Sequence, residues 1–257
     1  MSPWLVYVLL AAAGFIAGVV NTIAGGGSFL TLPALQFIGG LEVGIANGTN
    51  RLALLLSTGS ATTTFVRHGK LDAKLLARVA APILITTPLG VLLAVSLPKD
   101  AFETAFGILF LGMAVLLIRK PKLLLDPNRK PIDSRLAETA LFAALGLYVG
   151  FIQAGLGILV LIAMGLFHAR ELVDANAVKN AVGFLVTIVG LSLFIYHGKV
   201  CWLPGLVMAC GNFVGGIVGA RLALKEGKRL IFVVMITVMI AYGLKLVWPA
   251  VRGLLPA

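Results

Sequence analysis

Long apolar segments dominate this 257-residue chain and constrain its fold more than any other feature of the sequence. Hydrophobic residues make up 60% of the chain and charged residues only 12%, about half the charged share that is usual in a soluble domain. A core that hid so much apolar surface would leave almost nothing polar for the outside. A helix needs about 20 apolar residues to cross the hydrocarbon layer, so the pattern predicts an all-α integral membrane protein.

The apolar segments form two series of five. The first series covers residues 5–20, 29–38, 47–66, 75–97 and 101–118, and the second covers residues 136–152, 158–167, 175–196, 202–222 and 230–248. Two segments in each series are short or interrupted. The stretch between the series carries three prolines and most of the local charge. We therefore predict a first membrane repeat over residues 1–118, a cytoplasmic linker over 119–135 and a second membrane repeat over 136–257.

Individual residues repeat between the two series, as the hydropathy pattern does. Glu42, Ala46-Asn47 and His68-Gly69-Lys70 recur 129 positions later, and Gly14, Gly18 and Gly25 recur 132 positions later. Because each series holds an odd number of segments, the second enters the membrane from the opposite side. The sequence therefore predicts two five-segment inverted repeats with short, glycine-interrupted or re-entrant helices.

The basic residues of the loops favour five segments in each half. With this count, the charged stretches at residues 67–78, 119–135 and 221–229 share one side, which the positive-inside rule assigns to the cytoplasm. Four segments per half would put the basic cluster at 221–229 outside. We expect a multi-pass protein of the cell membrane (inner or plasma membrane) with both termini outside. A re-entrant hairpin in place of two short spans gives the same sidedness. The first segment lacks a preceding basic stretch, so we expect it to be a retained helix.

The formal net charge of +11 raises the alternative of nucleic-acid binding. The basic residues fall in short loops and are not interleaved with exposed aromatic residues, so we expect no nucleic-acid partner. Cys201 and Cys210 have no partners at metal-ligand spacing, so we expect neither a metal nor a cofactor. No hydrolase motif and no P-loop occurs in the sequence, and we expect the protein not to be an enzyme.

Interruptions of the apolar segments are the first places to look for a binding site. In lipid, a broken helix is tolerated only where it is buried in protein or lines a cavity. The longest break runs from Asn21 through Gly25, Gly26 and Gly27 to Ser28. Its glycines let the backbone approach a ligand, and Ser28 is placed to cap the next helix, whose N-terminus attracts anions. We favour a cavity over helix packing here and predict that these five residues bind substrate.

The corresponding break in the second half is Gly155-Leu-Gly157, which follows Gln153. Tight helix packing and a cavity both remain open for the two glycines. We include Gln153 among the predicted ligands.

A polar cluster, Asn47-Gly-Thr49-Asn50-Arg51, opens the third segment. Only 15 residues separate Arg51 from Arg67, which is roughly 22 Å of helix and less than the hydrocarbon thickness of about 30 Å. Arg51 must therefore lie inside or at the edge of the apolar layer, where a charge points to function. Snorkelling to the headgroups is the alternative.

The counterpart in the second half is Asn176-Ala-Val-Lys179-Asn180. All ten acidic residues lie in loops or at segment ends, which favours an anionic or neutral substrate. We predict that both clusters bind it, through Asn47, Thr49, Asn50, Arg51, Asn176, Lys179 and Asn180. Because inversion would put Arg51 and Lys179 on opposite sides of the midplane, we expect each to attract anions along one access path.

Four of these motifs together resemble the TauE/SafE family of sulfite and organosulfonate exporters, and the similarity runs over essentially the whole chain. They are Gly14-Phe-Ile-Ala-Gly18, Asn21-Thr-Ile-Ala-Gly-Gly-Gly-Ser28 with Pro33, Ala46-Asn-Gly-Thr-Asn-Arg51, and Gly150-Phe-Ile-Gln-Ala-Gly155. The resemblance implies a membrane permease for sulfite, sulfonates or other small sulfur-containing anions. Gly155-Leu-Gly157 departs from the glycine triplet often seen in the second half of family members, which argues against two identical half-sites.

We therefore predict an exporter of small anions, such as sulfite or organosulfonates, that works by alternating access. An anion or small-metabolite channel of the same architecture is the alternative, and a subunit of a larger complex is a third. The expected partners are the lipid bilayer and a small anionic substrate, and a homo-oligomer remains open.

Overall fold

The structure is a computed structural model that describes residues 2–119, 131–168, 172–222 and 228–254. These residues are helical and contain no β-strand. The helices are α1 (Pro3–Ala24), α2 (Ser28–Phe37), α3 (Val43–Arg67), α4 (Ala73–Ser96), α5 (Lys99–Ile118), α6 (Arg135–Phe151), α7 (Leu156–Phe167), α8 (Leu172–Tyr196), α9 (Trp202–Leu222) and α10 (Lys228–Leu254). Each predicted apolar segment forms one of them, so the all-α prediction is confirmed.

Five helices in the described ranges are long and apolar enough to cross a membrane. The candidate spans are Pro3–Asn21, Ala73–Ser96, Lys99–Ile118, Asp174–Tyr196 and Met235–Arg252. Several of these helices turn large apolar side chains outward, among them Val8 of α1 and Ile85 of α4. Such outward apolar surface is costly in water and suits a lipid environment. Helix α3 does not qualify as a span by composition, because it carries many hydroxyl and amide side chains.

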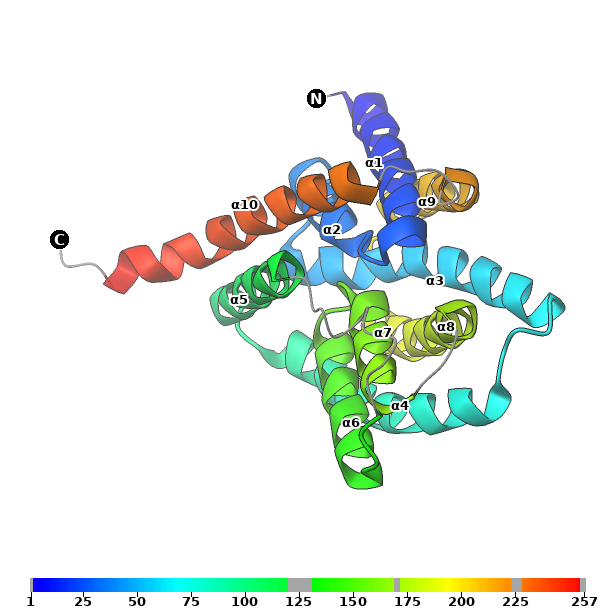
Figure 1. Ribbon diagram of the computed structural model, residues 1–257. Helices are drawn as coiled ribbons and strands as arrows, with labels where there is room; N and C mark the ends of the chain where they lie inside the picture. Colours follow the sequence, from blue (N-terminus) through cyan, green and yellow to red (C-terminus); the bar gives the residue numbers. More distant parts are fainter. Residues whose placement is uncertain (1, 120–130, 169–171, 223–227, 255–257) are drawn as a thin grey trace.

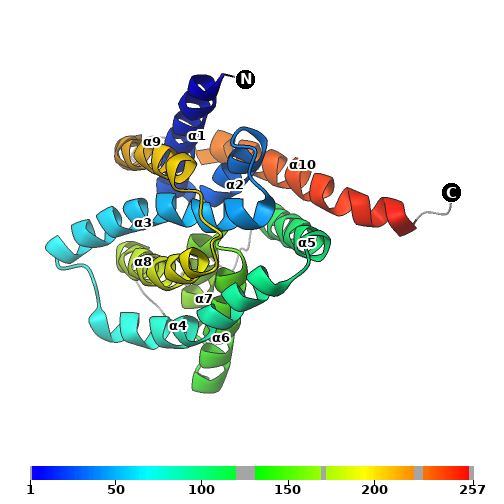
Figure 2. The ribbon, with the colours of Figure 1, turned by 180° about the vertical axis from the view of Figure 1, so that it is seen from behind.

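The helices pack in pairs that join the two halves of the chain. Helix α1 packs along α9, α6 packs along α4, α5 packs on α10 and α3 packs on α8. Figures 1 and 2 show the first of these pairs at one end of the molecule and the second at the other. Helix α3 also contacts α9, and α8 contacts α4. The six pairings named here are preserved when α1–α5 are exchanged in order for α6–α10, whereas the smaller contacts of α10 with α1 and α2 have no equally extensive counterpart.

Glycines repeated between the halves allow the close α1–α9 and α4–α6 approaches. A Cβ added at Gly14 or Gly18 would overlap backbone carbonyl oxygens of α9. A Cβ added at Gly146 or Gly150 would overlap atoms of Thr86 and Thr87 on α4. Small residues four apart are the usual means by which membrane helices approach closely. These sequence repeats thus serve helix packing in both halves.

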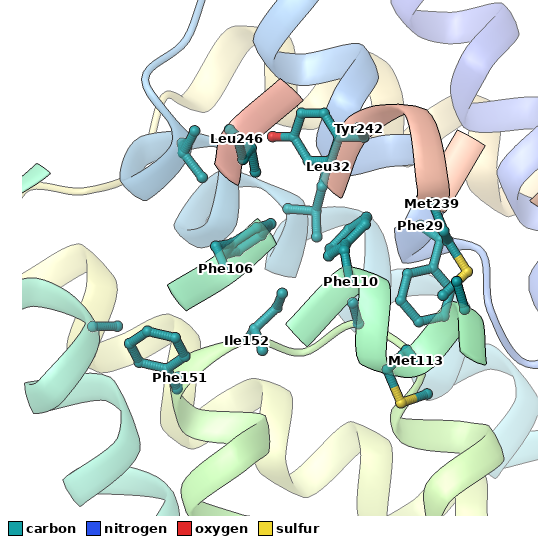
Figure 3. Packing of buried hydrophobic residues seen from close by; sticks show 14 of the residues in the cluster. Phe29, Leu32, Phe106, Phe110, Met113, Phe151, Ile152, Met239, Tyr242 and Leu246 are labelled. Carbon is teal, nitrogen blue, oxygen red and sulfur yellow. The ribbon is translucent and has the colours of Figure 1, made fainter. Parts of the chain in front are cut away.

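An aromatic cluster from α2, α5 and α10 fills the centre of the largest apolar core, as Figure 3 shows. The rings of Phe29 and Phe110 meet edge to face with centroids 5.1 Å apart, and Phe106 stacks on Phe110 at 5.2 Å. Phe29 also closes the space beside Gly155, where an added Cβ would lie 2.7 Å from its ring. This apolar core therefore packs directly against Gly155, in the helix break of the second half.

Candidate functional site

The two helix breaks lie against each other. Gly25 ends α1 with φ +78°, and Gly155 precedes α7 with φ +71°. Both values lie in the left-handed region that glycine adopts without strain. A Cβ added at Gly157 would lie 3.3 Å from the carbonyl oxygen of Gly25. The halves of the chain thus meet at their interrupted helices.

A small polar cavity lies at this meeting point. Its volume is about 30 Å³, enough for a water molecule or a compact ion. Its lining residues are Asn21, Gly25, Ser28, Leu54, Thr58, Gln153, Gly155, Leu156, Gly157, Lys179, Asn180 and Gly183. This lining, drawn from the described residues, holds one cationic side chain and no carboxylate.

Residues predicted from both breaks face this cavity. Asn21, Gly25 and Ser28 come from the first break, and Gln153 comes from the second. Gly155 and Gly157, for which packing and a cavity were both open, line it as well. The cavity therefore lies where the two breaks meet, and the role of these residues in binding substrate stays a prediction.

Lys179 and Asn180 contribute the α8 side of the cavity. The Lys179 Nζ donates to the Asn176 Oδ1 at 2.9 Å, and the Asn180 Nδ2 donates to the Asn176 backbone oxygen at 2.8 Å. Asn176 thus supports the two lining residues but does not itself line the cavity. Among the described residues, no carboxylate forms an ion pair with Lys179. Lys179 therefore places a positive charge beside neutral donors at the cavity.

The starts of two helices add to this positive potential. Ser28 is the first residue of α2, and Leu156 and Gly157 open α7. The first backbone N–H groups of a helix lack partners within it and carry partial positive charge. Ser28 does not cap α2, because Gly27 occupies the N-cap position and no side chain makes a capping bond there. The predicted capping role is thus wrong, although Ser28 lines the cavity.

Arg51, also predicted to bind substrate, is fully buried and lies outside the cavity lining. Its Nη2 donates to the backbone oxygens of Val149 at 2.9 Å and Gly150 at 2.8 Å. These are last-turn carbonyls of α6, which lack partners within their helix. Asn47 makes a similar bond, from its Nδ2 to the Phe151 oxygen at 2.7 Å. Arg51 and Asn47 therefore cap α6, and the expectation that Arg51 attracts anions along an open path is not met.

The other polar residues of this cluster also hold helices together. The Thr49 hydroxyl accepts a bond from the Cys201 backbone N–H at 2.9 Å. The Asn50 Oδ1 accepts one from the Thr31 hydroxyl at 2.5 Å. Both side chains are buried, and neither lines the cavity. They join α3 to α2 and to the loop before α9.

Gly26 and Gly27 lie beside the cavity and do not line it. A Cβ added at Gly26 would overlap the sulfur of Met235, and one at Gly27 would overlap the Ala17 carbonyl oxygen. These two glycines let α2 fit closely against α10 and α1.

Sequence reasoning missed two polar or small positions in the lining, Thr58 and Gly183. Thr58 follows Arg51 by two helical turns, and Gly183 follows Lys179 by one. Residues four and seven apart share a helix face. Continuing the face of Lys179 along α8 would have found Gly183. Thr58 could not be found from Arg51 by the same argument, because Arg51 itself lies outside the lining.

Glu138 is buried but lies away from the cavity, in the first turn of α6. Its carboxylate accepts from the Arg78 Nε at 2.9 Å and contacts the His168 Nε2 at 2.8 Å. This buried acid is therefore occupied by its own basic partners and adds no carboxylate to the cavity.

The described residues form helices, several of them apolar enough to span a membrane, with a polar cavity where two helix breaks meet. This architecture is typical of a membrane transport protein. The family described as Sulfite exporter TauE/SafE matches residues 10–246, and the chain belongs to this family. The prediction made from the four motifs is confirmed.

Curated relatives share nearly the full length of the chain. It is 29% identical over 237 residues to "Probable membrane transporter protein ORF9" of Sinorhizobium sp, covering 92% of this chain and 90% of that protein. It is 28% identical over 223 residues to a "Probable membrane transporter protein" of Haemophilus influenzae, covering 87% of each. It is 29% identical over 248 residues to "Probable membrane transporter protein YfcA" of Escherichia coli K12, covering 96% and 91%. No solved structure matches the chain.

Proposed function

We propose that this protein exports a small oxyanion, of the sulfite or sulfonate class, across the cell membrane by alternating access. One observation carries the proposal: among the described residues, those that line the cavity between the two helix breaks include a single cation, Lys179, several neutral donors and no carboxylate. The family description and the names of the relatives support membrane transport. The family description also supports sulfite as the first substrate to test.

The binding role of each lining residue follows from its chemistry. Lys179 supplies the charge that attracts the anion, and the N-termini of α2 and α7 add partial positive charge. The Ser28 hydroxyl and the side-chain amides of Asn21, Gln153 and Asn180 offer neutral donors to the anion's oxygens. Neutral donors hold an anion less tightly than a second buried cation would, which favours release and turnover. The cavity, of about 30 Å³, is small, so a compact sulfite-like group needs less opening of the site than a longer sulfonate.

We also infer that α1–α5 and α6–α10 are inverted repeats that move against each other. The main helix pairings (α1 with α9, α4 with α6, α5 with α10, α3 with α8, α3 with α9 and α4 with α8) support this inference, because they are preserved when the two series of helices are exchanged. A site at the interface of two such repeats can be exposed to either side by rocking one half.

Cysteine labelling tests the inversion in a chain that carries Cys201→Ser and Cys210→Ser. Single cysteines placed at Ser2 and Gly198 should react with an impermeant reagent from outside. A cysteine at Asn128, which lies outside the described residues in the proposed cytoplasmic linker, should not react. Reaction at Gly198 only from the cytoplasmic side would contradict the arrangement of five segments in each half.

Transport is tested with purified protein in liposomes. We expect saturable sulfite flux, and we expect internal sulfite to stimulate uptake of labelled sulfite by counterflow. Unitary conductance would identify the channel alternative. Absence of flux from the purified chain, with binding retained, would indicate a subunit of a larger complex.

A further inference from the structure

Gln153 connects the buried Arg51 to the cavity through a chain of hydrogen bonds. The Arg51 Nη1 donates to the Gln153 Oε1 at 2.9 Å, and the Gln153 Nε2 donates to the Thr187 hydroxyl at 2.5 Å. The Thr187 hydroxyl donates in turn to the Gly183 carbonyl oxygen at 2.6 Å. The three side chains are almost completely buried. Gln153 and Gly183 line the cavity.

The donor-to-acceptor direction of this series of hydrogen bonds is fixed at both of its ends. A guanidinium can only donate, and a backbone carbonyl can only accept. Because the single hydroxyl hydrogen of Thr187 goes to Gly183, its oxygen must accept from Gln153. A flipped Gln153 amide would face the Arg51 donors with its own NH2 group, leaving buried donors unpaired at substantial cost. The amide of Gln153 therefore has one favourable orientation.

We propose that Arg51 is a positioning residue that holds the Gln153 amide with its nitrogen on the cavity side, so that this wall selects anions. The proposal rests on the cavity being the substrate site. An amide nitrogen carries two hydrogens, and only one is used on Thr187. The second is the donor that this wall offers to a substrate oxygen. The buried Arg51 guanidinium, which is the first donor in this series of hydrogen bonds, polarises the Gln153 amide and strengthens its second N–H as a donor.

Arg51 suits this role because it cannot move toward the anion itself. Its other terminal nitrogen is engaged by the Val149 and Gly150 carbonyls, and its guanidinium carbon lies 4.7 Å from the centre of the Phe194 ring. No carboxylate in the described part of the chain pairs with it. Its charge thus acts on the substrate through the Gln153 amide.

Two substitutions test the orientation of the amide, with sulfite as the probe. Gln153→Glu puts a carboxylate against Arg51, removes the donor and adds negative charge to the cavity. We expect the apparent sulfite affinity, read from ligand-dependent thermal stabilisation and from KM, to fall at least tenfold. Thr187→Val removes the acceptor that fixes the amide, and we expect a KM increase of a few-fold with little change in maximal flux. Thr187→Ser keeps the hydroxyl and should behave as the wild type.

Unliganded stability tests the hydrogen-bond chain separately from transport. Gln153→Glu should raise the melting temperature above that of Gln153→Met, because only the carboxylate accepts from Arg51. A lower melting temperature for Gln153→Glu would overturn the Arg51–Gln153 pairing. Wild-type sulfite affinity in both Gln153→Glu and Thr187→Val would overturn the positioning role and leave the proposed function standing. Failure of the wild type to bind sulfite would count against the proposed function, while the melting temperatures still decide the pairing.

Discussion

The clusters at residues 47–51 and 176–180 are repeats of one sequence feature, yet the structure uses them differently. In the first, Asn47, Thr49, Asn50 and Arg51 are buried, and they bond to α2, to the end of α6 and to the loop before α9. In the second, the polar side chains are only partly buried and bond within α8. Lys179 and Asn180 face the cavity. The first cluster joins helices to one another, whereas the second contributes Lys179 and Asn180 to the cavity lining.

The ends of the two neighbouring helices explain this difference. Both helices keep a last bond from the cap residue to the carbonyl four residues earlier: Gly25 N–H to the Asn21 oxygen at 2.8 Å in α1, and Ile152 N–H to the Tyr148 oxygen at 2.7 Å in α6. The cap residues differ in conformation, because Gly25 is left-handed, φ +78°. Helix α6 ends at Ile152 with an extended backbone, φ −144°. Its last carbonyls therefore need donors from outside, and Asn47 and Arg51 supply them. The side-chain hydrogen bonds of Lys179 and Asn180 stay within α8 in the described structure, so both side chains are available to a ligand.

The largest expected effect follows from removing the α6 cap. Arg51→Met leaves the Val149, Gly150 and Gln153 oxygens without their donor. We expect a loss of about 3 kcal/mol or more in the free energy of unfolding, read as a lower melting temperature in detergent. Asn180→Met, at the equivalent position of the second half, is the matched control and should change the melting temperature little. Equal losses in the two variants would remove the distinction between the clusters.

The second prediction concerns the charge at the cavity. Lys179→Gln should lower sulfite affinity roughly tenfold or more, because a charge-assisted bond to the anion is lost. Its melting temperature without ligand should stay near that of the wild type, since Lys179 bonds only within α8 in the described structure. Lys179→Arg, which keeps the charge, should retain part of the affinity. Titration of sulfite against the purified variants measures both quantities, and unchanged affinity in Lys179→Gln would place the anion elsewhere.

A smaller effect is expected at the C-terminus of α1, where Gly25 is left-handed. Gly25→Ala forces a side chain into the left-handed region, which costs about 1 kcal/mol. The nearest atoms to the added Cβ would be 3.6 Å away, so the loss is conformational and not steric. Gly25→Asn should lose less, because asparagine tolerates this conformation. Chemical denaturation of the unliganded variants gives the comparison, and an alanine variant as stable as the wild type would show that α1 does not depend on this cap.

The smallest effect is expected where α7 meets Lys179. A Cβ at Gly157 would lie 3.2 Å from the Lys179 Cδ, so Gly157→Ala should displace this side chain slightly. We expect sulfite affinity to change by a few-fold at nearly constant melting temperature. Gly165→Ala in the same helix meets no atom within 4 Å and serves as the control. If the two variants bind sulfite equally well, the contact between Gly157 and Lys179 does not shape the site.

The sequence was sufficient to predict the helices and the place of the cavity. Apolar segment length set the order of helices, and the cost of a broken helix in lipid pointed to Asn21, Ser28 and Gln153. The repeated glycines predicted a relation between the halves, and Gly14 and Gly146 occupy related close contacts in the structure. Segment length and glycine spacing are local properties of the chain, so they can be read from the sequence without knowledge of the fold.

The roles of Arg51 and Ser28 could not be read in the same way. Whether a buried arginine meets a ligand or a helix end depends on which helix packs against it, and α6 lies about 100 residues away along the chain. Gly27 takes a helical conformation, φ −54° and ψ −33°, so α2 begins without a side-chain cap. Packing against α1 and α10 fixes that start, and these contacts are distant in sequence.

The central claim is that an anion binds between the two helix breaks beside Lys179, and locating a heavier analogue of sulfite tests it most directly. Crystals of the purified protein soaked in selenite would reveal the selenium by its anomalous scattering. We predict one principal peak in the cavity, with selenite oxygens at about 3 Å from the Lys179 Nζ and the Ser28 hydroxyl. The peak should disappear in Lys179→Gln crystals. A principal peak outside the residues that line this cavity, or one that persists in Lys179→Gln, would contradict the account.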